Sequence, residues 1–151
     1  MFQPLRYLLL AIAVVHCDCT AKSALQEQHG GSDTTCPLTV KVLDAVKGTP
    51  AGRMGIKVYR KSAEWVQVAA GVTDAAGEIH NMITEQEFPA GLYRVEFDTK
   101  AYWLSEGTKP FHEVADVVFE AHADGHRHYI LALLLSPYSF TTTAVITNPH
   151  Q

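Results

Sequence analysis

The most restrictive feature of this sequence is a pair of alternating segments near its C-terminal end, Ile130–Leu135 and Tyr138–Ile146. Neighbouring side chains of a β-strand point to opposite faces. Both faces of both segments would then carry apolar or hydroxyl side chains, and neither face would carry a charge. An ordinary sandwich strand buries one face and exposes the other to water. The second face therefore has to be covered by another sheet, another subunit or a ligand.

The same two segments predict a long apolar hairpin, because only Ser136 and Pro137 separate them. We expect its last strand to lie at a sheet edge. An uncharged edge strand is prone to aggregate unless another chain pairs with it. We therefore predict that the protein forms oligomers through this hairpin.

Short apolar runs separated by turn signals recur along the chain from Cys36 onward. This spacing predicts an all-β fold, a two-sheet sandwich of about eight strands with one short helix. The helix is expected over Asp98–Gly107, with Asp98 capping its first turn and Gly107 supplying a left-handed residue at its end. The expected strands are Leu38–Asp44, Gly55–Lys61, Glu64–Thr73, Gly91–Phe97, Val114–Ala121, His128–Leu135 and Tyr138–Ile146, with turns at Lys47–Pro50 and Asp74–Gly77.

The first 35 residues differ from the rest of the chain. Tyr7–Val15 is an unbroken apolar run that is too short to cross a bilayer and has the length of a signal-peptide core. We predict a signal peptide at residues 1–19, cleaved after Cys19 or Ala21, and hence a secreted protein. A membrane anchor, or lipidation at Cys17, is the alternative. Residues 20–35 are predicted to form a flexible polar arm, and residues 36–151 the folded domain.

Charge and cysteine content exclude several classes of function. The net charge of −4 argues against a nucleic-acid-binding protein, which normally carries a basic face. Residues 7–15 are too short to cross a membrane and no other apolar run is long enough, so no membrane partner is expected. Cleavage after Cys19 would leave Cys36 as the only cysteine, without an internal disulfide.

The histidines of the segment His122–His128 resemble a metal-binding tract. However, Asp124 and Gly125 mark a turn, and alternating histidines in a loop are usually solvated. We therefore expect no metal ion and no cofactor.

A set of unusual side chains lies on the second faces of the first strand and the last two. If these strands share a sheet, the set forms an apolar channel with a few hydroxyls inside and one ammonium at its rim. Such a channel suits a flat aromatic ligand that carries a carboxylate. A surface sheet with chance apolar residues is an equally good interpretation of the pattern. The residues are Lys41, Leu43, Ala132, Leu134, Thr141, Thr143 and Val145.

Four stretches carry a resemblance to a known family: CPLTVKVLDAVKGTPA (36–51), DTKAYW (98–103), PFHE (110–113) and LLSPYSFTTTAVITNP (134–149). In these the sequence resembles the transthyretin family, from Cys36 to the C-terminus. The resemblance implies a homotetramer, a dimer of dimers whose central channel holds two thyroid-hormone sites. It also implies a binding surface for retinol-binding protein around Gly107–Lys109 and Tyr138, although Thr108 is polar where the family is usually apolar.

The resemblance also assigns roles to individual positions. Lys41 corresponds to the family's rim lysine and Glu78 to its rim glutamate. Leu43, Ala132 and Leu134 correspond to the pockets that receive iodines, and Thr143 and Val145 to the deep channel. Two departures, Ile130 in place of a threonine and Thr141 in place of a serine, predict a narrower and more apolar channel.

The same fold serves an enzyme, hydroxyisourate hydrolase, which the chain resembles in LLLSP (133–137). That enzyme has histidines where Lys41 and Ile130 stand, an arginine where Val72 stands, and a C-terminal Tyr-Arg-Gly-Ser. This chain ends TAVITNPHQ instead. General acid–base chemistry on a purine-derived ring needs those groups, so we expect the protein not to be an enzyme.

Overall fold

The computed structural model describes residues 36–125 and 127–148. The predicted signal peptide and N-terminal arm lie outside these residues, and so does His126. Within them, no helix is long and apolar enough to span a membrane.

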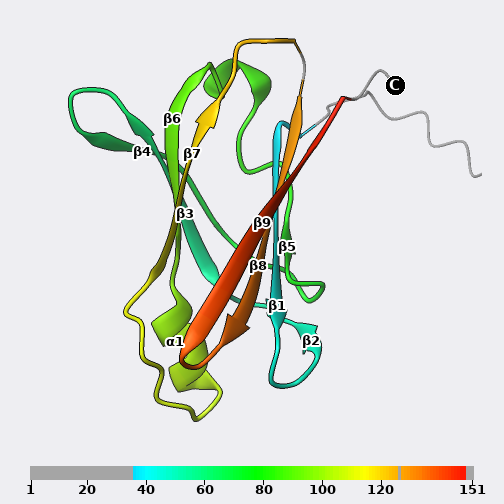
Figure 1. The fold of residues 1–151 in the computed structure, drawn as a ribbon, viewed down its shortest axis with the longest axis vertical. Helices are drawn as coiled ribbons and strands as arrows, with labels where there is room; N and C mark the ends of the chain where they lie inside the picture. Colours follow the sequence, from blue (N-terminus) through cyan, green and yellow to red (C-terminus); the bar gives the residue numbers. More distant parts are fainter. Residues whose placement is uncertain (1–35, 126, 149–151) are drawn as a thin grey trace, which may run out of the picture. The chain divides into compact units, whose positions relative to one another are not determined.

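Two sheets face each other, with β3, β4, β6 and β7 on one side and β1, β8 and β9 on the other (Figure 1). The first sheet has the order β2-β1-β8-β9, and β5 pairs with the remaining part of β1. Its strands are β1 (Leu38–Asp44), β2 (Thr49–Pro50), β5 (Glu78–Ile79), β8 (His128–Ser136) and β9 (Ser139–Thr147). β1 and β8 are parallel, and the other pairs of this sheet are antiparallel. The parallel pair joins two strands from opposite ends of the domain.

The second sheet is antiparallel throughout, in the order β4-β3-β6-β7. Its strands are β3 (Gly55–Lys61), β4 (Trp65–Val72), β6 (Gly91–Phe97) and β7 (Ala115–Ala121). All seven predicted strands are present, and their ends differ from the prediction by no more than one residue. The predicted all-β sandwich with one short helix is therefore confirmed.

The core forms because every long strand turns alternate apolar side chains inward. On β1 the inward residues Leu38, Val40 and Val42 are fully buried. They meet fully buried residues of the second sheet, among them Val95 and Phe97 of β6. Burying a side chain of this size contributes about 1.5–3 kcal/mol, so this alternation specifies the register and makes the opposite faces point outward.

The helix α1 (Thr99–Ser105) follows β6 directly. Asp98 caps it by accepting a hydrogen bond from the Ala101 amide at 3.2 Å, and Gly107 has a left-handed φ of 76°. The predicted helix and both its ends are thus confirmed. The helix residues Tyr102 and Trp103 are buried and pack the helix against the end of the sandwich.

Three short elements were not predicted. The segment expected to be a turn, Lys47–Pro50, is in part a strand: the turn lies at residues 45–48, and Thr49–Pro50 pairs with β1 as β2. A 3-10 helix, η1 (Glu85–Glu87), begins at a capping box between Thr84 and Glu87. The third is β5, which positions part of the candidate site.

Candidate ligand-binding face

The pairing of β1, β8 and β9 aligns the predicted residues in rows across one sheet. The rows are Lys41–Ala132–Thr143, Leu43–Leu134–Thr141 and Thr39–Ile130–Val145. Their neighbours along β1 and β8, such as Val42 and Leu133, are fully buried in the core. The rows therefore share the outer face of the sheet. The first strand and the last two strands do share one sheet, which the sequence analysis required for these residues to lie together.

Glu78 is brought to this face by β5, which pairs Glu78 with Lys41 and Ile79 with Val40. The Lys41 ammonium forms an ion pair with the Glu78 carboxylate at 2.9 Å, with 43% and 25% of the two side chains exposed. The hydrogen bond from Lys41 is the largest cause that lowers the pKa of Glu78 below its ordinary value. The two predicted rim residues thus lie in direct contact.

A tight turn places Glu78 at this point. The Asp74 carboxylate accepts hydrogen bonds from the amides of Ala76 and Glu78, both at 2.9 Å. Gly77 has a φ of 71°, and its backbone carbonyl oxygen accepts a hydrogen bond from the Val42 amide at 2.8 Å. A Cβ at Gly77 would overlap the Val42 carbonyl oxygen. Only glycine therefore allows the chain to approach β1 closely enough for Glu78 to reach Lys41.

His80 is a site residue that the sequence-based reasoning missed. Its Nε2 lies 2.8 Å from the second carboxylate oxygen of Glu78, and this contact is a further cause of the lowered pKa of Glu78. The signal was present in the order Glu78-Ile79-His80, because residues two apart in an extended chain point the same way. Glu78 thus holds one partner with each oxygen.

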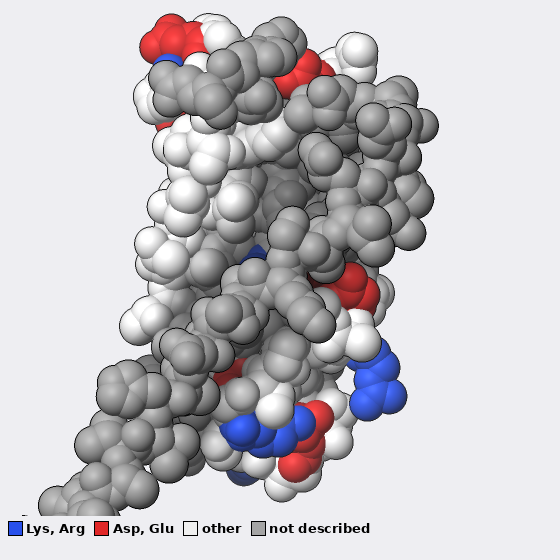
Figure 2. Space-filling model, turned by 90° about the vertical axis from the view of Figure 1, so that its right-hand side faces the viewer, with Lys and Arg blue, Asp and Glu red and all other residues white. Residues whose placement is uncertain are grey.

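The rest of the face is uncharged. Leu134 is 43% exposed and Val145 49%, and Thr143 carries a hydroxyl beside them. In the space-filling view, a long white margin on the left carries no charged side chain, whereas charged side chains of the described residues are visible at the top, toward the right and at the lower end (Figure 2). An apolar surface of this kind is normally covered by a ligand or by another protein surface.

The edge beside this face is also open. β9 and β7 are the last strands of their sheets. Ile146, which points toward the second sheet, is 52% exposed. A hollow of about 190 Å³ enters the sandwich here between residues of β7 and β9, including Phe119 and Ala144. Within the part of the chain that the structure describes, the outer backbone edge of β9 has no paired strand, and both faces of β9 are incompletely covered.

The three positions compared with the hydrolase, Lys41, Val72 and Ile130, do not all lie on one face. Lys41 and Ile130, the two positions at which the resemblance to the hydrolase implies histidines, both lie on this face. Val72 does not: it lies on β4 in the second sheet, paired with Gly55. The acid Glu78, and not Val72, lies beside Lys41.

Histidines elsewhere have structural contacts. His112 packs edge-on against Phe111 and Phe140, with ring centroids 5.0 and 5.1 Å apart. His122 lies 3.9 Å from Glu120, and both side chains are largely exposed. Among residues 36–125 and 127–148, no cluster of three metal-ligating side chains occurs.

A sandwich whose outer sheet face is apolar, carries hydroxyls and ends at one ion pair is the architecture of a binding protein for a small amphipathic molecule. The sequence profile of the HIUase/Transthyretin family matches residues 38–143, and the chain belongs to that family. It is 70% identical to transthyretin from Sparus aurata, whose crystal structure superposes with a TM-score of 0.73 and aligns with 75% of this chain and 99% of that chain. It is 69% identical to sea bream transthyretin solved in complex with thyroxine, with a TM-score of 0.73 and coverage of 77% of this chain and 100% of that one.

Proposed function

We propose that this protein transports thyroid hormones and binds them on the outer face of the β1-β8-β9 sheet. The observation that carries the proposal is the identity of 69% over the whole of a transthyretin that was solved with thyroxine bound. The ion pair at the end of an uncharged face supports it independently. The protein is a carrier and not an enzyme, since both of these relatives are transthyretins.

The ligand's amino-acid group is proposed to lie between Lys41 and Glu78. A zwitterion offers a carboxylate to the ammonium and an ammonium to the carboxylate, so it replaces one ion pair with two. Glu78 keeps its contact with His80 in either state. The iodinated rings then lie along Ala132 and Leu134, where polarisable iodine gains dispersion energy from close apolar neighbours.

Thr141, Thr143, Val145 and Leu43 complete the proposed pocket. Thr143 and Thr141 stand opposite Ala132 and Leu134 across the β8–β9 pair, so each hydroxyl lies beside an apolar side chain. Leu43 lies in the same row as Leu134 and Thr141, and Val145 lies beside Ile130, so these two residues form the two sides of the proposed pocket. One sheet face covers only one side of a flat ligand, so the pocket needs a second wall.

A second copy of the chain is the proposed wall, in a homotetramer built as a dimer of dimers. Two features support this assembly: the open edge of β9, which could pair with another strand, and the uncharged outer face, which faces water in a single chain. Two such faces placed opposite each other would enclose a channel with a Lys41–Glu78 pair at each mouth.

Secretion and a protein partner are further proposals. The similarity to transthyretins supports secretion of this chain, in agreement with the signal peptide predicted at residues 1–19.

A protein contact is supported by two exposed aromatic side chains. Tyr138 is 73% exposed and Phe111 69%, with ring centroids 6.1 Å apart. This aromatic pair beside the hairpin supports a protein contact, for which retinol-binding protein near Gly107–Lys109 is the proposed partner.

The test is to measure thyroxine and triiodothyronine binding to the protein and to two tryptophan variants. Ala132→Trp fills the centre of the proposed pocket and should abolish saturable binding. Ala123→Trp adds the same side chain to an exposed loop and should leave binding unchanged. If Ala132→Trp folds and still binds thyroxine like the parent protein, the ligand lies elsewhere.

A further inference from the structure

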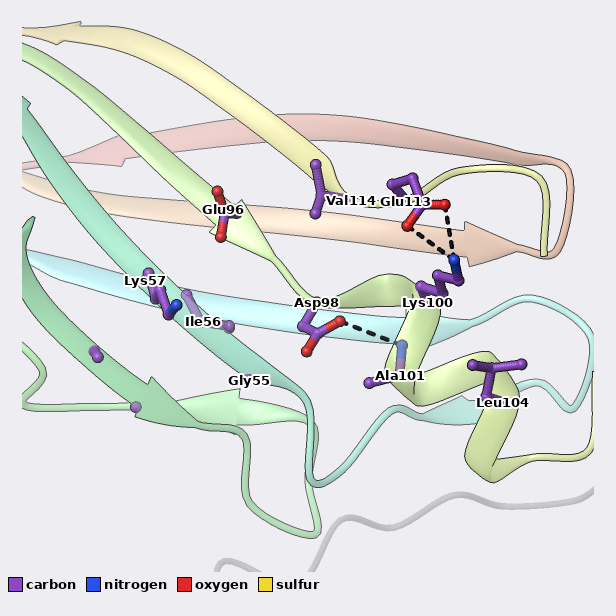
Figure 3. Close-up of a pocket in the computed structure, with 12 residues that line it drawn as sticks. Gly55, Ile56, Lys57, Glu96, Asp98, Lys100, Ala101, Leu104, Glu113 and Val114 are labelled. Atoms are coloured by element: carbon purple, nitrogen blue, oxygen red, sulfur yellow. Dashed lines mark hydrogen bonds and ion pairs between the residues drawn. The ribbon is translucent and has the colours of Figure 1, made fainter. Parts of the chain in front are cut away.

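The second sheet carries a hollow of about 520 Å³ between its outer face and helix α1 (Figure 3). This volume lies in the range of pockets that hold small molecules. Its lining comes from β3, β4, β6, the helix and the segment before β7, and none of the residues of the proposed hormone face takes part. Any ligand here would bind independently of that face.

Small residues create the hollow. Gly55, Ala70 and Ala101 leave its base without long side chains, whereas Leu104 and Val114 are 54% and 41% exposed at its border. Because Gly55 does not have a left-handed φ, its glycine is not required by the backbone. A Cβ at Gly55 would make only an ordinary contact with the Asp98 Cβ at 3.8 Å. A larger side chain at position 55 would therefore fit the backbone and occupy part of the hollow.

One end of the hollow repeats the charge arrangement of the hormone face. Lys57 on β3 lies directly opposite Glu96 on β6, as Lys41 lies opposite Glu78. Whereas Lys41 and Glu78 touch at 2.9 Å, Lys57 forms no ion pair with any of the described residues, and the nearest cation to Glu96 is Arg94 at 4.0 Å. Figure 3 shows Lys57 and Glu96 on neighbouring strands, with no ion pair drawn between them.

The charges at the other end are already engaged. Lys100 donates to both carboxylate oxygens of Glu113, at 2.7 and 2.9 Å, and Asp98 caps the helix. Among the described residues, Lys57 is thus a cation without an ion pair, and the anion opposite it, Glu96, has only the 4.0 Å contact with Arg94, next to an apolar depression. A simple anion would meet Glu96, and a simple cation would meet Lys57. A zwitterion satisfies both.

We propose that this groove is a second binding site, which takes an amphipathic α-amino acid with an aromatic side chain. Its carboxylate contacts Lys57 and its ammonium contacts Glu96, while the ring lies over Gly55, Ala70 and Ala101 and against Leu104. The proposal does not depend on the function of the hormone face.

The test is a titration of the isotopically labelled protein with 3,5-diiodo-L-tyrosine, followed by the amide NMR signals of Gly55 and Ala101. These signals should shift and saturate. Gly55→Val fills the hollow and should remove the saturable shift. Lys57→Met should weaken binding by about fivefold to tenfold, the loss expected for one exposed charge contact. Lys61→Met removes a charge from the same face of the same strand outside the groove and should have no effect.

Two further results would overturn the assignment. If the only saturable shifts lie on β8 and β9, the amino acid binds the hormone face and the groove is not a site. The deaminated analogue, 3-(3,5-diiodo-4-hydroxyphenyl)propanoate, lacks the ammonium group. If it binds the groove as tightly as the amino acid does, Glu96 does not bind an ammonium group and the proposed ligand class is wrong. Repeating the titration with Ala132→Trp separates the two sites, because groove binding should survive in that variant.

Discussion

Replacing Tyr102 with phenylalanine tests how the strand that carries Lys41 is anchored. The Tyr102 hydroxyl donates a 2.6 Å hydrogen bond to the carboxylate of Asp44, the last residue of β1. Asp44 is only 1% exposed, and its other carboxylate oxygen accepts from the amides of Val46 and Lys47 at 2.8 and 2.9 Å. A buried carboxylate thus joins β1, the following turn and helix α1.

The expected cost follows from these contacts. A hydrogen bond to a charged group contributes about 1.5–3 kcal/mol. The two backbone amides remain in the variant, so Asp44 is not left without donors. We therefore expect Tyr102→Phe to lower the free energy of unfolding by about 2 kcal/mol. Tyr59→Phe is the control, because the Tyr59 hydroxyl makes no hydrogen bond with the described residues, and it should cost less than about 0.5 kcal/mol.

The assay is denaturant unfolding at one fixed protein concentration, since dissociation of an oligomer adds a concentration-dependent term. Tyr102→Phe, Asp44→Asn and the double variant form a cycle whose coupling energy should be about 1–2 kcal/mol. A coupling energy near zero, or a loss for Tyr102→Phe no larger than for the control, would refute the reasoning.

The same contact predicts a pH dependence. Burial raises the pKa of Asp44, but the hydrogen bonds from Tyr102 and from the Lys47 and Val46 amides outweigh it, so the net pKa lies below the ordinary value. A carboxylate with a depressed pKa contributes stability that is present above its unfolded pKa, about 3.9, and is lost as the pH falls through the folded value. The cost of Tyr102→Phe should therefore shrink below about pH 4. A cost that stays constant down to pH 2 would contradict this assignment.

The remaining predictions concern binding, assembly, catalysis and processing. Lys41→Ala should weaken thyroxine binding by only about fivefold to tenfold, because the contact is partly exposed; a loss as complete as that of Ala132→Trp would show that the charge dominates. Thr143→Asp should destabilise the assembled channel, since an unpaired buried charge costs several kcal/mol; an unchanged mass in dilution experiments would argue against a covered face. Freshly generated hydroxyisourate should decay at the buffer rate, and turnover that survives repurification would overturn the assignment as a carrier. The N-terminus of the secreted chain should be Thr20 or Lys22, and a chain that still begins at Met1 would contradict the predicted cleavage.

The strands were predictable because apolar residues alternate with a period of two along nearly every long segment. The same alternation predicted which residues of β1, β8 and β9 share a face, and the paired registers confirm it. The helix was predictable for a different reason: Asp98 and Gly107 are end signals that act within a few residues of the chain.

The contacts around Glu78 were not predictable from pattern. β5 has only two residues and shows no period, and its pairing with β1 depends on the close approach that Gly77 allows. Resemblance supplied Glu78 as a rim residue, but neither resemblance nor pattern supplied His80.

We propose that four chains enclose a channel which binds thyroid hormone. The most direct test is to titrate thyroxine into the purified protein while its mass is followed by light scattering in the same sample. We expect a mass of four mature chains and saturation at two thyroxine molecules per tetramer. A mass of one chain at micromolar concentration, or no saturable uptake of thyroxine by the tetramer, would contradict it.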